Sequence, residues 1–276
     1  MATITIQQIQ AIEKEMLRET LAILQRHHIT FYMCCGSVLG AIRHKGPIPW
    51  DTDMDVLIPF PQLEKARSCL EKELSSRFCI DDLRRNKGYK NLFPRVAMPH
   101  TSSDTLHIDL FPLMGLPDDK EEQLAICREI AKRQKVFIRL KHMRSNIAHP
   151  NFAKNLIGKI IEIFCSPFSK VKLTEQFYKL ISRYDYNTAK YVMNACGHYG
   201  AKNIFEKQVF GTPAKAQYGK LEVPLPAQYD FYLKRYYRNY MELPPAEERN
   251  AWFGFVLEID DQDFALIEDV LKNEQK

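Results

Sequence analysis

The sequence lacks the features that mark secreted and membrane-spanning proteins. None of its 276 residues lies in a run of the ~20 apolar residues that cross a bilayer. The first residues, MATITIQQIQAIEKEM, show neither a basic start before an apolar stretch nor a small-residue cleavage site. Seven cysteines, an odd number without a C-x-x-C pair, favour reduced thiols over a disulfide framework or a zinc knuckle. We therefore expect a cytoplasmic protein.

Several common catalytic signatures are also missing. No glycine-rich loop ends in Gly-Lys-Ser/Thr, and no G-x-G-x-x-G follows an expected strand. Neither H-E-x-x-H nor G-x-S-x-G occurs. P-loop, Rossmann, zincin and α/β-hydrolase interpretations therefore have no support.

The composition and the spacing of apolar residues predict a globular protein that mixes helices and strands. Apolar residues make up 45% of the chain and charged residues 26%, which is ordinary for a soluble domain. Helical and strand patterns alternate before residue 120, and helical periodicity dominates after it. The expected helices cover 5–26, 37–44, 62–76, 121–144, 152–165 and 172–183, and the expected strands cover 30–35, 54–59 and 106–110, the last closed by Pro112.

Three aspartates at alternate positions are the strongest local feature. Asp51, Asp53 and Asp55 would share one face of an extended segment, because side chains alternate along a strand. Carboxylates this close repel one another, so a divalent cation or a basic side chain is expected among them. An EF-hand is excluded, because Val56 stands where that loop needs glycine and Gln62 where it needs a bidentate glutamate.

The surrounding residues favour a nucleotidyltransferase-type arrangement. Gly36 and Ser37 follow a strand and open a helix, whose free N–H groups can hold a phosphate. A further aspartate, Asp109, lies on a later strand, so two neighbouring strands would gather three carboxylates. Mg²⁺ suits such a site because it prefers oxygen ligands at about 2.0–2.1 Å and shares its shell with phosphates. A phosphoryl-transfer centre is the chemical expectation.

The expected fold is α+β, a nucleotidyltransferase-like mixed sheet with flanking helices and a helical C-terminal half. Residues 1–120 would form the catalytic core. Residues 121–276 would form a helical region that packs on this core and includes a Tyr- and Pro-rich segment at 205–245.

Three sequence blocks resemble the LicD/fukutin-related family of phosphocholine and polyol-phosphate transferases. GSVLGAIRHKGPIPWDTDMDVLIP is similar to the family signature G-[ST]-L-L-G-A-x-R-H-x-G-F-I-P-W-D-D-D-[IM]-D. HIDLFPLMGLPDD resembles the second block and YDFYLKRYYRNYMELPP the C-terminal block. Three departures stand out: Thr52 replaces the middle aspartate, Met114 stands where aspartate is common, and Arg238-Asn239 replaces Gly-Asp.

The resemblance implies a donor, a reaction and a set of ligands. The donor is a CDP-linked alcohol, and attack falls on the phosphorus that carries the alcohol, so that CMP leaves. The expected reaction moves phosphocholine from CDP-choline to a sugar hydroxyl of a teichoic acid or lipopolysaccharide precursor. Asp53 and Asp55 are assigned to Mg²⁺ or Mn²⁺, and Asp109 either completes the shell or acts as general base. Asp51 would cap or orient this group.

Basic and aromatic residues supply candidates for donor binding. Arg43 and Lys45 follow the short helix and are expected to bind the diphosphate and the leaving CMP, and Arg95 is a second phosphate candidate. His44 is not chosen as a donor-binding residue, since a histidine without a partner motif is more often a packing residue. The segment 229–240 holds six aromatic residues that either surround a quaternary ammonium or belong to the core.

Three alternatives stay open at this stage. The chain could be a nucleotidyltransferase on another substrate, a polyol-phosphate transferase that uses a CDP-polyol, or an inactive binding module. No nucleic-acid partner is expected, because the thirteen Lys/Arg of 124–183 lie in a helical region with few aromatics. Loss of Asp53, Asp55 or Asp109 would mark an inactive relative, and all three are present.

A lipid-linked glycan acceptor would require contact with the inner face of the membrane. The segment 155–168, NLIGKIIEIFCSPF, is apolar around most of its circumference and has lysines nearby. It fits either shallow interfacial binding or a buried helix.

Overall fold

A computed structural model describes residues 2–86, 89, 91–101, 106–145, 167–250 and 256–274. Its helices are α1 (Ile6–Arg26), α2 (Cys35–Leu39), α3 (Phe60–Glu73), α4 (Lys120–Ser145), α6 (Pro167–Ile181), α7 (Tyr229–Tyr237), α8 (Ala246–Asn250) and α9 (Asp261–Glu274). Its strands are β1 (Ala2–Thr5), β2 (Tyr32–Met33), β3 (Met54–Pro59), β4 (Cys79–Asp81), β5 (Arg95–Ala97), β6 (His107–Leu116), β7 (Tyr191–Asn194), β8 (Ile204–Glu206), β9 (Ala214–Tyr218), β10 (Leu221–Leu225) and β11 (Val256–Ile259).

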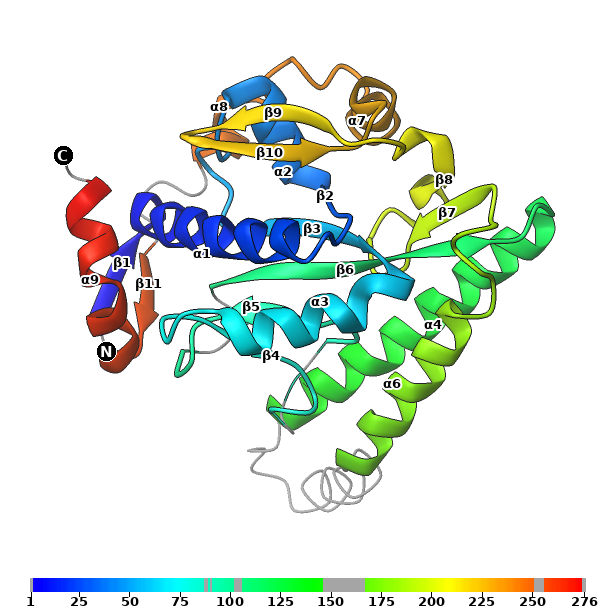
Figure 1. The fold of residues 1–276 in the computed structure, drawn as a ribbon, viewed down its shortest axis with the longest axis horizontal. Helices are drawn as coiled ribbons and strands as arrows, with labels where there is room; N and C mark the ends of the chain where they lie inside the picture. Colours follow the sequence, from blue (N-terminus) through cyan, green and yellow to red (C-terminus); the bar gives the residue numbers. More distant parts are fainter. Residues whose placement is uncertain are drawn as a thin grey trace.

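A mixed sheet of seven strands forms the centre of the molecule. Its order is β2-β3-β6-β5-β4, and β7 pairs with the far end of β6 and with β8. β3 and β6 run parallel, while the other neighbouring pairs are antiparallel. Helices α1 and α3 contact each other and β6 (Figure 1). The α+β fold expected from the sequence is confirmed.

The two parallel strands lie inside the protein, as their mostly apolar sequences favour. All ten residues of β6 are buried, and five of the six in β3 are buried as well. β3 has the bounds that its apolar run predicts. β6 continues through Pro112 to Leu116, so the expected end at this proline is wrong. Pro112 lacks an N–H group, but its carbonyl still accepts a hydrogen bond from the Ala195 N–H at 3.0 Å.

The second half of the chain is less helical than the sequence patterns predict. Five strands, β7 to β11, lie beyond residue 120, and β7 and β8 extend the central sheet. β9 and β10 form a hairpin in which Tyr218 pairs with Leu221, so Gly219 and Lys220 make the turn. Gly219 has φ +64°, which glycine adopts at low cost. Helices α4 and α6 confirm the periodicity of 121–144 and 172–183.

The segment expected to contact a membrane cannot be placed, because 155–166 lies outside the described residues. The same holds for the helix expected over 152–165. Over the residues that are described, no helix combines the length and apolar character required to cross a bilayer.

Candidate active site

The parallel pairing of β3 with β6 places two carboxylates side by side. Asp55 and Asp109 are register partners, so their side chains leave the same face of neighbouring strands. Asp55 is half-buried and Asp109 is buried. The next strand brings Arg95 opposite Asp109 on the other side. The expectation that two neighbouring strands would bring these aspartates together is met for Asp55 and Asp109.

Asp109 is held by a buried ion pair. The Arg95 Nε donates to Asp109 Oδ1 at 2.5 Å, and Nη2 donates to Oδ2 at 3.4 Å. His107 Nε2 lies 3.3 Å from the same Oδ1. Arg95 is only 8% exposed, so its guanidinium fixes a site carboxylate instead of facing the solvent as a phosphate ligand would. Arg95 therefore positions Asp109, and phosphate binding by Arg95 stays a prediction that this contact does not support.

Asp51 and Asp53 form a second carboxyl pair at the start of β3. Burial, a hydrogen bond with the Asp53 side chain and the charge of Asp53 raise the pKa of Asp51 to about 8. The Thr52 N–H donates to Asp51 Oδ1 at 3.1 Å. Gly36 leaves room for this pair, because a Cβ there would meet Asp51 Oδ2 at 2.7 Å and the carboxylate would have to shift. Asp53 itself is exposed.

Glu13 is a further acidic residue that the motifs did not reveal. It lies on α1, is 1% exposed, and its Oε1 has no hydrogen-bond partner. Burial raises the pKa of Glu13, and the charges of Asp53 and Asp51 raise it further. Its position could have signalled a site, since a carboxylate on the apolar face of an amphipathic helix is rare without a partner.

The carboxylate oxygens of this region are the ligand type that a hard divalent cation prefers, although no three described carboxylates have oxygens within 4.8 Å of one another. Burial raises the pKa of Asp55 well above its usual range, and Cys35, Asp53 and Asp109 add to this effect. A cation among these oxygens would offset the repulsion and give the buried Glu13 oxygen an electrostatic partner. Arg95 already binds the Asp109 carboxylate in this structure. The assignment of one metal ion to Asp53, Asp55 and Asp109 together therefore stays a prediction.

The turn expected to hold a phosphate is used to position Asp55. The Cys35 N–H donates to the Tyr232 hydroxyl at 3.0 Å, and the Ser37 N–H donates to the Cys34 carbonyl at 3.0 Å. The Ser37 hydroxyl accepts the Asp55 N–H at 3.0 Å. Two N–H groups of this helix start are thus engaged within the protein. Phosphate binding by Gly36 and Ser37 stays a prediction that these contacts do not support.

Arg43 connects two sequence blocks that are far apart in the chain. Its Nη1 donates to the carbonyls of Tyr240 and Glu242, both at 3.0 Å, and its Nε donates to His44 Nε2 at 2.9 Å. Through these hydrogen bonds, Arg43 joins the first sequence block to the C-terminal block. Lys45 is exposed, so its ammonium group is the more accessible of the two for a donor diphosphate.

Two of the six aromatic residues in 229–240 are buried in the core, and another, Tyr237, pairs with Tyr199 from a different segment. Tyr232 and Tyr236 are buried and pack against Phe205. The Tyr199 hydroxyl donates to the Tyr237 hydroxyl at 3.2 Å. Burial raises the pKa of both tyrosines, and Cys35 and Asp55 add to the shift in each. Tyr199 lies outside every recognised block and was not a sequence-based candidate.

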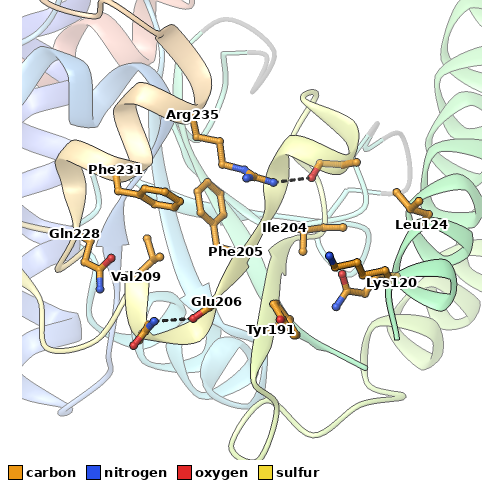
Figure 2. Close-up of a pocket in the computed structure, with 13 residues that line it drawn as sticks. Lys120, Leu124, Tyr191, Ile204, Phe205, Glu206, Val209, Gln228, Phe231 and Arg235 are labelled. Carbon is orange, nitrogen blue, oxygen red and sulfur yellow. Dashed lines mark hydrogen bonds between the residues drawn. The ribbon is translucent and has the colours of Figure 1, made fainter. Parts of the chain in front are cut away.

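A pocket of about 650 Å³ opens beyond the Phe205 ring. Figure 2 shows Phe231 and Arg235 from α7 on one side and Lys120 and Leu124 from α4 on the other. Phe231 is 51% exposed and lies edge-on to Phe205. Phe205 also stacks on Tyr232, whose hydroxyl binds the Cys35 N–H. Phe205 and Tyr232 therefore connect the pocket to the turn at Cys35.

Comparison with known proteins assigns this region to a family. Residues 28–145 match the family described as LicD/FKTN/FKRP, nucleotidyltransferase domain. The chain is 22% identical over 259 residues to the lipopolysaccharide cholinephosphotransferase LicD of Haemophilus influenzae, covering 90% of this chain and 96% of that protein. Residues 28–145 thus resemble the LicD family.

A second relative shares only the shorter segment. The ribitol 5-phosphate transferase FKRP of Homo sapiens is 31% identical over 102 residues, which are 36% of this chain and 20% of FKRP. The chain thus spans about a fifth of that protein. The segment matched to the LicD family contains Asp51, Asp53, Asp55 and Asp109, while Glu13 and Tyr199 lie outside it.

The raised carboxyl pKa values predict how stability changes with pH. The folded protein binds more protons than the unfolded chain wherever a carboxyl pKa is raised, so the free energy of unfolding falls as pH rises between about 4 and 8 without a divalent cation. Asp51→Asn should make this fall shallower by on the order of a few kcal/mol. Urea unfolding of both proteins across this pH range measures the difference. The same dependence of the unfolding free energy on pH in the two proteins would contradict the prediction.

Proposed function

We propose that the protein transfers phosphocholine from CDP-choline to a sugar hydroxyl of a cell-surface glycan precursor, such as teichoic acid or lipopolysaccharide, and releases CMP. The observation that carries this proposal is the register pairing of Asp55 with Asp109 inside a LicD-family segment. The name of the Haemophilus influenzae relative supports phosphocholine as the transferred group.

The reaction exchanges one phosphorus–oxygen bond for another. The sugar oxygen forms a bond to the phosphorus that carries choline, the bond to the CMP phosphate breaks, and the hydroxyl proton moves to a carboxylate. Asp109, which lies beside Asp55 in register, takes this proton. Mg²⁺ or Mn²⁺ held by Asp53 and Asp55 would neutralise charge on the transferring group. Arg95 keeps Asp109 oriented, and the exposed Lys45 binds the leaving CMP.

The tyrosine pair next to the acidic group suits the choline end of the donor. A quaternary ammonium group is attracted to aromatic faces. Tyr199 is 36% exposed and its hydroxyl contacts that of Tyr237. We assign these two rings to the trimethylammonium group.

Removal of one of these rings should affect one donor and spare another. We expect Tyr237→Leu to raise the KM for CDP-choline by about 5–30-fold, because a desolvated cation–π contact contributes roughly 1–2 kcal/mol. The KM for CDP-ribitol should change little, since ribitol carries no cation. CMP release with each donor measures both values. An equal change for the two donors would indicate a purely structural role for the ring.

Transfer of a polyol phosphate is the second candidate. FKRP is named as a ribitol 5-phosphate transferase, and it shares 102 residues with this chain. CMP release from CDP-choline, CDP-ribitol and CDP-glycerol, assayed side by side with Mg²⁺ and a glycan acceptor, separates the two candidates. Preference for CDP-choline supports the main proposal, and preference for either CDP-polyol would replace it.

We assign the pocket of Figure 2 to the glycan acceptor. The exposed Phe231 ring offers a face to a sugar, and the amides of Gln123, Gln208 and Gln228 line the same space. Phe231→Ala should raise the KM for the acceptor by about 10-fold and leave the KM for CDP-choline unchanged. Val256→Ala is the matched control, since Val256 is 55% exposed and lies on β11. Equal acceptor KM values in wild type and Phe231→Ala would show that this pocket does not bind the acceptor.

A further inference from the structure

Two cysteines lie against the central aspartate of the acidic group. Cys34 Sγ, Cys35 Sγ and an Asp55 carboxylate oxygen all lie within 4.8 Å of one another. Cys34 is buried and Cys35 is half-buried. Across the part of the chain that the structure describes, no other group of three such side chains meets this distance. Neither thiol has a role in the proposed transfer.

Backbone contacts fix the three side chains relative to one another. The Cys34 N–H donates to the Asp55 carbonyl at 3.1 Å, which joins the turn to β3. The Cys35 N–H donates to the Tyr232 hydroxyl, and Cys35 has φ +51°, a left-handed backbone conformation. The site is therefore formed by the fold before any ion binds.

The ligand types decide which ion this group would select. Thiolate sulfur favours zinc and other soft or borderline ions, whereas Mg²⁺ avoids it. Zinc bonds are about 2.3 Å to sulfur and about 2.0–2.2 Å to carboxylate oxygen, so ligand atoms on one tetrahedral zinc lie about 3.5–3.8 Å apart. Atoms already within 4.8 Å reach this geometry through small side-chain rotations.

We propose that Cys34, Cys35 and Asp55 bind a divalent cation of the zinc class, which thereby takes Asp55 away from the catalytic cation and inhibits transfer. The inhibitory part rests on the proposed function, and the binding part does not. Binding releases the two thiol protons to solvent, leaves both sulfurs in the same oxidation state, and keeps a fourth position open for water or a phosphate oxygen.

Cobalt absorption tests the binding without reference to activity. Co²⁺ added to the full-length, metal-free, reduced protein should produce the near-ultraviolet charge-transfer absorption of cobalt bound to thiolate. Cys35→Ser should lose at least about half of this absorption and bind Co²⁺ at least about 10-fold more weakly, since one of the two sulfur ligands is gone. Cys69→Ser is the matched control, because Cys69 is also half-buried and should leave the spectrum intact. Thermal melting shows that each variant is folded.

The spectra and an inhibition assay together decide the proposal. Absence of the thiolate absorption in wild type, or equal absorption in wild type and Cys35→Ser, would overturn the site. In Mg²⁺-dependent CMP release, the zinc concentration that halves each protein's own rate should rise at least about 10-fold in Cys35→Ser. An unchanged value would overturn the inhibition. If no CDP-alcohol is turned over, the proposed function fails while the cobalt spectra still test the site.

Discussion

Asp55→Asn should lower the rate of CMP release from CDP-choline by at least about 100-fold, because Asp55 is proposed as a metal ligand and loss of a ligand exceeds the roughly 10–100-fold cost of losing a group that only supports one. The substitution keeps the size of the side chain and removes its charge. It leaves the register of β3 and β6 intact, since Asp55 pairs through its backbone. Steady-state CMP release under saturating Mg²⁺ measures the effect.

The same variant should be at least as stable as wild type in the absence of divalent cations. Burial and neighbouring charges disfavour the ionised form of Asp55, so a neutral amide removes an unfavourable term from the folded state. Asp269→Asn is the control, because the Asp269 side chain is 66% exposed and lies on α9. Activity close to wild type in Asp55→Asn would refute the assigned role. A loss of activity that merely follows a loss of folding would also refute it.

Arg95→Met should lower the free energy of unfolding by about 3–5 kcal/mol, because it removes the arginine of a buried ion pair and leaves the Asp109 carboxylate buried. Both side chains of this pair are 10% exposed. Urea unfolding at neutral pH measures the change. The double variant Arg95→Met with Asp109→Asn should recover part of it, since the buried charge is then removed.

An exposed ion pair supplies the matched control for this prediction. Arg26 contacts Glu73 at 2.6 Å, but the Arg26 side chain is 64% exposed. Arg26→Met should therefore cost less than about 1 kcal/mol. Equal losses in Arg95→Met and Arg26→Met would show that Arg95 does not hold a buried charge.

The parts of the site that could be predicted from sequence are those set by short-range patterns. The apolar run after the aspartates predicted β3 with its observed bounds, because strand alternation and burial act over a few residues. The D-x-D motif and Asp109 were found through residue type, and the parallel register then confirmed that Asp55 and Asp109 are neighbours. The family resemblance is confirmed by the match over residues 28–145.

The parts that could not be predicted depend on contacts between distant segments. The pairing of Arg95 with Asp109 depends on a neighbouring strand that places the two residues opposite each other. Arg43 reaches carbonyls almost two hundred positions away in the chain, at Tyr240 and Glu242. Tyr199 contacts the hydroxyl of Tyr237, 38 positions further along the chain. No local pattern encodes these pairings.

The strands of the second half were missed for a different reason. β7 is a four-residue strand, and it is stabilised by pairing with β6. Short strands carry too few residues for alternation to be distinguished from helical spacing. The strand β6 does not end at Pro112 as expected, because the Pro112 carbonyl can still accept a hydrogen bond from the Ala195 N–H.

The most direct test of the account follows the phosphorus atoms during the reaction. Protein, Mg²⁺, CDP-choline and either a lipopolysaccharide or a teichoic acid acceptor are combined, and ³¹P NMR records the products. We expect CMP to appear together with an equal amount of phosphocholine diester on the acceptor. Formation of free phosphocholine with a cytidylylated acceptor, or no consumption of CDP-choline with either acceptor, would contradict it.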